Sequence, residues 1–121
     1  MGARRHQDLR VWQIAIQLVK LVYVATARFP TTELYGLTSQ MRRAAVSVPS
    51  NIAEGAARGG TREFVQFLSV ARGSLSELET QVVIARELGF LESTTEIDVL
   101  IGELFRALGG LLVSLKKRTK A

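Results

Sequence analysis

Apolar residues recur at helical spacing in four stretches of the chain, and short segments rich in glycine or proline separate them. The spacing predicts helices over about residues 9–28, 37–58, 61–88 and 95–115. Asp8 is placed to cap the first helix, and Ser93 to Glu96 form a capping box before the fourth. No stretch shows the alternation of a half-buried strand. Because the connections are short, we expect one domain, residues 1–121, folded as an all-α, antiparallel up-and-down four-helix bundle.

Two residues inside the expected helices are poor helix formers. Pro49, in the second helix, has no amide hydrogen to donate, so a kink is expected there. Gly73, in the third, costs about 1 kcal/mol relative to alanine, which predicts a close approach of a neighbouring helix. Gly59 and Gly60 are expected to end the second helix.

The first helix has a wide apolar face. Its polar residues fall within an arc of about 80°, whereas a helix that faces one core needs an apolar stripe only somewhat over 100° wide. We therefore expect this helix to be covered on two sides, on one by the rest of the bundle and on the other by another subunit or a partner protein. The polar residues of the arc are Arg10, Gln13, Gln17, Lys20 and Arg28.

The net charge of +5 changes this picture mainly at the chain ends. Basic tails are expected at about residues 1–7 and 116–121, whereas residues 11–115 carry nine basic and ten acidic residues, a net charge of −1. Basic tails attract phosphate and acidic surfaces alike. The absence of cysteine excludes disulfides and thiolate metal sites, and it fits a reducing cytoplasm.

The apolar run over residues 11–25 does not have the pattern of a targeting or membrane segment. Gln13, Gln17 and Lys20 interrupt it at helical spacing, unlike the apolar region of a signal peptide. It is also too short for a membrane span. We therefore expect a cytoplasmic protein that does not associate with membranes.

No group of residues points to catalysis or to a cofactor. His6 is the only histidine, so an imidazole metal site has no second ligand, and we expect it to be a solvated tail residue. The glycine-rich segment 55–61 follows a helix and lacks the lysine of a phosphate-binding loop, so it is interpreted as a turn. The helices carry no Glu-x-x-His motif for a di-iron site. We expect neither an enzyme nor a bound metal or cofactor.

A polar stripe on the second helix has two interpretations. Its residues share an arc of about 80°. The stripe fits a solvated helix face, but it also fits a polar network between subunits or a binding surface, and periodicity does not separate these. The residues are Arg43, Ser47, Asn51, Glu54 and Arg58.

The segment YGLTSQMRRAAVSVPSNIAEG, residues 35–55, resembles a specific protein family. Asp8-Leu9 with Val11-Trp12, Phe29-Pro30, and residues 64–68 with 71–74 match the same family in order. The chain is similar over about residues 8–91 to the four-helix-bundle proteins encoded by intervening sequences of bacterial 23S ribosomal RNA genes.

This resemblance implies self-association. A related branch, the accessory proteins of diversity-generating retroelements, forms a ring-shaped homopentamer that binds a reverse transcriptase and nucleic acid through a basic surface. The chain is therefore expected to form a homo-oligomer, with a pentamer as the model. Its nearly neutral body departs from the strongly basic surface of that branch.

Two functional hypotheses follow. In the first, the chain is a homo-oligomeric adaptor that binds RNA, another nucleic acid or an RNA-handling protein. Its phosphate contacts would be Arg42, Arg43, Arg58, Arg62, Arg72, Lys116, Lys117 and Arg118. In the second, it is a structural or protein-interaction module without nucleic-acid function. Arg43, Ser47, Asn51 and Glu54 would then form the intersubunit polar network.

Overall fold

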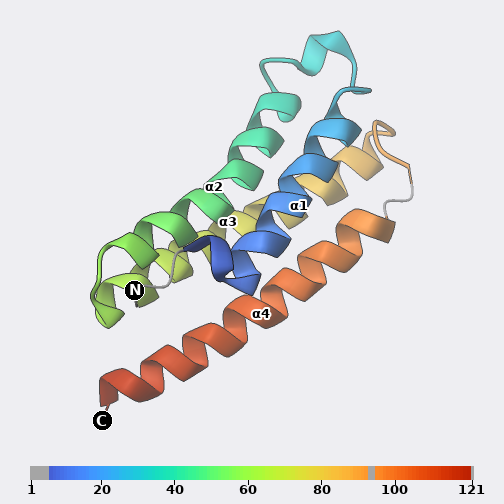
Figure 1. Ribbon diagram of the computed structural model, residues 1–121. Coiled ribbons are helices and arrows are strands. Elements are labelled where there is room, and N and C mark those ends of the chain that lie inside the picture. Colours follow the sequence, from blue (N-terminus) through green and yellow to red (C-terminus); the bar gives the residue numbers. More distant parts are fainter. Residues whose placement is uncertain (1–5, 93–94, 121) are drawn as a thin grey trace.

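The computed structural model describes residues 6–92 and 95–120 and contains four long helices (Figure 1). They are α1 (Arg10–Thr26), α2 (Leu37–Ala57), α3 (Thr61–Glu87) and α4 (Thr95–Lys120). Two short 3₁₀ helices, η1 (His6–Asp8) and η2 (Thr31–Glu33), precede α1 and α2. The described residues contain no strand. The expected all-α, four-helix architecture is therefore confirmed.

The helix ends agree only in part with the expected signals. Gly59 and Gly89 follow α2 and α3 with φ of 85° and 78°, a left-handed conformation that glycine adopts readily. Leu9 occupies the N-cap of α1 without a side-chain cap, so the expected capping by Asp8 is wrong. At the start of α2, the Glu33 carboxylate accepts a hydrogen bond from the Leu37 amide at 3.1 Å and so caps that helix. The capping box before α4 includes residues 93–94, outside the described residues.

The last helix is longer than its apolar pattern indicated. α4 continues to Lys120, so Lys116, Lys117 and Arg118 are helical residues and do not belong to a separate tail. Cations near a helix C-terminus interact favourably with the helix dipole, which explains the extension. The basic residues of the C-terminus are therefore held in defined directions on a helix.

One core runs through the bundle. α1 and α3 each pack against α2 and α4. Among the described residues, no helix combines the length and the hydropathy of a membrane-spanning segment. The helices of the same chain thus cover much of the wide apolar face of α1, while Tyr23 and Val24 remain 42% and 64% exposed. The largest fully buried side chains include Leu18, Met41, Ile52, Leu68, Leu75, Leu78, Leu104, Leu108 and Leu112.

α2 and α3 approach each other closely at Gly55. A Cβ atom at this position would lie 2.6 Å from the Phe67 Cβ and 3.0 Å from the Phe64 Cδ1. Gly73, where the sequence predicted a close approach, is exposed, and a Cβ there would meet nothing within 4 Å. That prediction is wrong because, among the described residues, no helix lies against the outer face of α3 at Gly73. Pro49 is buried within α2, and a bend at this residue stays a prediction.

The connections gather at two ends of the bundle. Figure 1 shows the α2–α3 turn and the C-terminal end of α4 at one end. The α1–α2 connection, the end of α3 and the start of α4 lie at the other. Segments far apart in the sequence therefore share each end.

Alanine at the two glycines should have opposite effects on stability. We expect Gly55→Ala to lower the free energy of unfolding by about 1–3 kcal/mol, because its methyl group overlaps Phe67. Gly73→Ala should raise it by about 0.5–1 kcal/mol, since alanine favours an exposed helix. Urea unfolding of both variants measures the difference. A Gly55→Ala variant as stable as the parent would contradict the close approach.

Candidate nucleic-acid interface

Charge is separated along the axis of the bundle. Residues 58–72, from the α2–α3 turn almost to the middle of α3, and residues 112–120 at the end of α4 hold seven basic residues and one acidic residue, Glu63. Residues 27–36 and 86–98, at the opposite end, hold five acidic and two basic residues. Four of the seven basic residues lie beyond residue 115, so within the nearly neutral body, residues 11–115, the two ends carry net charges of only +2 and −3.

Two of the predicted cations lie on the faces of α3 and α4 that meet in the bundle. Arg86, near the end of α3, donates a hydrogen bond to the carboxylate of Asp98, near the start of α4. This bond shows which residues of the two helices lie side by side. Lys116 lies 18 residues beyond Asp98, five full turns, and hence on the same face of α4. Arg72 lies 14 residues before Arg86, within about 40° of its direction on α3. By helix periodicity, Arg72 and Lys116 therefore lie on the faces of α3 and α4 that carry the Arg86–Asp98 pair.

Five of the predicted phosphate ligands form what we call the basic end. All five side chains are exposed, and within the described residues none of their charged groups takes part in an ion pair or a side-chain hydrogen bond. Such charges remain available to a polyanion. The residues of the basic end are Arg62, Arg72, Lys116, Lys117 and Arg118.

Arg58 lies beside the basic end but its charge is shared with acidic neighbours. Its guanidinium donates a hydrogen bond to the Glu54 carboxylate at 2.9 Å, lies 3.9 Å from Glu63 and sits over the Phe67 ring. It therefore helps to close the α2–α3 turn, and its positive charge is partly neutralised for a ligand.

Arg42 is half-buried and tied to α1. Its Nε donates a hydrogen bond to the Thr26 Oγ1 at 2.8 Å, and its guanidinium lies 4.5 Å from the centre of the Tyr23 ring. Thr26 in turn donates to the Val22 carbonyl oxygen at 2.7 Å. Arg42 thus holds α2 against the last turn of α1, far from the basic end. As a phosphate ligand it would have to give up these contacts.

Arg43 borders a groove that the sequence did not reveal. The exposed Arg43 side chain makes no hydrogen bond or ion pair with other described residues. The groove passes over the first half of α2 and reaches α1 and the α1–α2 connection. We call it the aromatic groove; it is lined by Tyr23, Leu34, Tyr35, Thr38, Ser39, Arg42, Arg43, Val46 and Ser47.

Most of the polar stripe on α2 has partners within the chain. The Ser47 and Ser74 hydroxyls lie 2.8 Å apart and join α2 to α3. Asn51 Nδ2 donates to the Ser47 backbone oxygen at 2.8 Å and to its hydroxyl at 2.9 Å. With Glu54 paired to Arg58, these contacts account for three of the four residues assigned to an intersubunit network. Their use between subunits stays a prediction.

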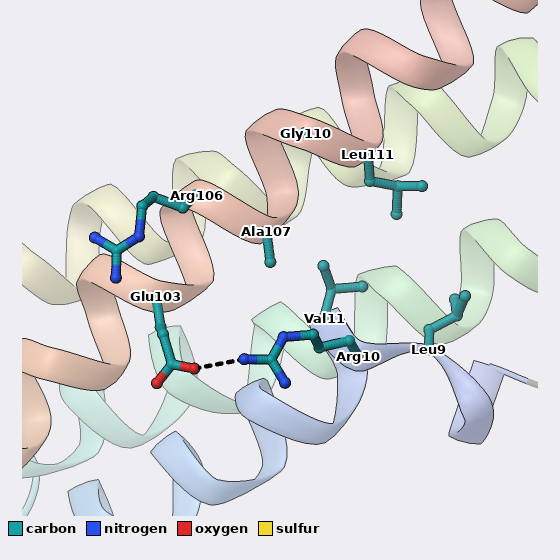
Figure 2. Close-up of a pocket in the computed structure, with 8 residues that line it drawn as sticks. All are labelled: Leu9, Arg10, Val11, Glu103, Arg106, Ala107, Gly110 and Leu111. Atoms are coloured by element: carbon teal, nitrogen blue, oxygen red, sulfur yellow. Dashed lines mark hydrogen bonds and ion pairs between the residues drawn. The ribbon is translucent and has the colours of Figure 1, made fainter.

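A second groove separates the start of α1 from α4. Figure 2 shows the Arg10–Glu103 ion pair across it, with nitrogen and oxygen 2.8 Å apart, and Arg106 pointing away. Both paired groups reach solvent. The pair joins the first residue of α1 to Glu103 of α4. Beyond Glu103, α4 continues for 17 residues toward the basic end.

The single histidine is not a fully solvated tail residue. His6 lies in η1, and its ring packs edge-on against Trp12 with the ring centres 5.3 Å apart. The expectation of a solvated side chain is wrong because η1 folds back onto α1.

The neighbouring arginines of α2 should respond differently to truncation. We expect Arg42→Ala to lower the free energy of unfolding by about 1–2 kcal/mol, since it removes the Thr26 hydrogen bond and the Tyr23 contact. Arg43→Ala, the matched control, should change it by less than about 0.5 kcal/mol. Equal losses in urea unfolding would show that Arg42 does not hold α2 against α1.

Comparison with known proteins agrees with this fold. The sequence model of a family described as 23S rRNA-intervening sequence protein matches residues 7–110, from η1 into the second half of α4. A search of the curated proteins finds no match. Because the family model covers most of the chain, the chain belongs to the 23S rRNA-intervening sequence protein family.

Proposed function

We propose that the chain is a non-enzymatic, homo-oligomeric adaptor that binds RNA through the phosphates of its backbone. The observation that carries this proposal is the basic end, where α3 and α4 present five exposed cations that have no acidic partner among the described residues. Neutralising phosphates releases condensed counterions, which supplies most of the affinity of sequence-independent binding.

The residues of the basic end fit phosphate binding better than base reading. Three are arginines, whose planar guanidinium groups match phosphate oxygens in pairs. None is aromatic, so the basic end offers no ring on which an RNA base would stack. We therefore propose binding that depends little on RNA sequence.

Self-association is supported by apolar surface outside the aromatic groove. These side chains are 42–64% exposed in the single chain, and contacts between copies would bury some of them. They are Val24, Val70, Val83, Ile84, Leu88, Val99 and Val113.

Affinity for RNA should fall steeply with salt. Three to five phosphate contacts predict a loss of roughly 20- to 100-fold between about 50 and 200 mM salt, measured by fluorescence anisotropy with a labelled single-stranded RNA. Lys116→Gln with Lys117→Gln should reduce the slope of log affinity against log salt by about 1.4.

The matched control removes two charges elsewhere. Lys20 and Arg28 are exposed and lie outside the basic end. Lys20→Gln with Arg28→Gln should leave the salt slope within about 0.3 of the parent value, because their charges do not contact the RNA. Equal slopes for the two double variants would rule out the basic end as the RNA site.

The chain should be larger than a monomer in solution. Light scattering without RNA is expected to give a whole multiple of 13.3 kDa, since assembly would cover the exposed apolar side chains. A mass of one chain at the concentration of the RNA titration would contradict the homo-oligomer.

A further inference from the structure

The aromatic groove gathers the exposed apolar side chains of α1, α2 and their connection. Tyr35 is 92% exposed and Leu34, Tyr23 and Val46 are 39–47% exposed, although all four line one groove. Tyr23, the Leu34–Tyr35 pair and Val46 are each more than ten residues apart in the sequence. Exposed apolar side chains that meet in this way mark a site for another molecule.

The two arginines of the groove differ in their contacts, because Arg42 is bound to α1 and Arg43 has no ion-pair partner among the described residues. The hydrogen bond to Thr26 and the contact with Tyr23 fix the Arg42 guanidinium along the α1 side. Arg43 borders the opposite side without an ion pair among the described residues. Glu77, which lines an adjoining hollow with Arg43, accepts a hydrogen bond from Gln81 at 3.3 Å instead.

The lining of the groove is complementary to an acidic, partly apolar ligand. No acidic side chain lines it, and the hydroxyls of Thr38 and Ser39 add hydrogen-bonding groups. Tyrosine and arginine are the residue types that most often supply the binding energy of protein interfaces. An arginine also binds a carboxylate with two parallel hydrogen bonds when the geometry is good.

We propose that the aromatic groove binds an acidic linear segment of a partner protein. An aromatic or branched aliphatic side chain of the segment lies against Leu34, Tyr35 and Val46, and a neighbouring carboxylate pairs with the Arg43 guanidinium. This site lies away from the basic end and works independently of RNA binding.

The surroundings of the groove favour such a segment over a nucleic acid. The segments beside the groove, residues 27–36 and 86–98, carry five acidic residues against two basic ones, so an extended polyanion that ran beyond Arg42 and Arg43 would meet net negative charge. A short segment places only one or two carboxylates beside Arg43.

Selection from a random dodecapeptide library tests the proposal. The full chain is the target, and affinities of selected peptides are measured by fluorescence anisotropy. We expect peptides with Asp or Glu within a few residues of an aromatic or aliphatic anchor. Arg43→Glu and Tyr35→Ala should each weaken binding by roughly tenfold or more. A peptide with its acidic residue changed to Lys should regain affinity for the Arg43→Glu variant.

The controls separate the alternative occupants of the groove. Lys116→Gln with Lys117→Gln should leave peptide affinity unchanged, so failure of RNA binding and failure of this site are distinguishable. Selected peptides without acidic residues, or equal binding to the Arg43→Glu variant, would overturn the proposal. So would displacement of the peptide from the Lys116→Gln, Lys117→Gln variant by a single-stranded RNA. A lower light-scattering mass for Tyr35→Ala would assign the groove to contacts between copies instead and also overturn it.

Discussion

The packing of α2 on α3 depends on the absence of a side chain at Gly55. The phenyl side chains of Phe64 and Phe67 fill the place where any other residue would put its Cβ. Farther along the same interface, Ser47 and Ser74 are small enough for their hydroxyls to bond directly. Because α2 and α3 meet so closely, the register between them is fixed, and with it the position of every charged residue on their outer faces.

This fixed register gives the bundle its two unlike ends. The α2–α3 turn brings Arg62 to the end where α4 delivers Lys116 to Arg118, and the exposed cations there have no acidic partners in the described part of the chain. The opposite end combines acidic residues with the exposed apolar side chains of the aromatic groove. A molecule with this arrangement can bind a different ligand at each end. The proposed adaptor role consists of holding these two ligands at the same time.

The fold could be predicted from the sequence because it depends on local signals. The apolar stripes of Leu68, Leu75 and Leu78 on α3, and of Leu104 and Leu108 on α4, are buried as their spacing indicated. The glycines show the limit of this reasoning. Gly55 and Gly73 look alike in sequence, and only tertiary packing determines which of them faces a neighbouring helix.

The candidate sites could be predicted less well because they join distant segments. The helical spacing placed Arg43, and not Arg42, on the polar stripe of the second helix. It gave no sign that Arg42 is tied to Thr26 of α1. The aromatic groove was missed altogether, since Tyr23 and Tyr35 belong to different elements. A count of charge along the chain likewise hid the polarity of the bundle, because each end joins segments far apart in the sequence, 58–72 with 112–120 and 27–36 with 86–98.

The central claim is that RNA binds at the basic end, and the most direct measurement maps that contact residue by residue. Amide chemical shifts of the full chain, recorded by NMR with and without a short single-stranded RNA, report where the RNA lies. The account predicts shifts concentrated in residues 58–72 and 112–119, with residues 34–47 unchanged. Shifts confined to residues 34–47, or none at RNA concentrations that saturate the anisotropy signal, would contradict it.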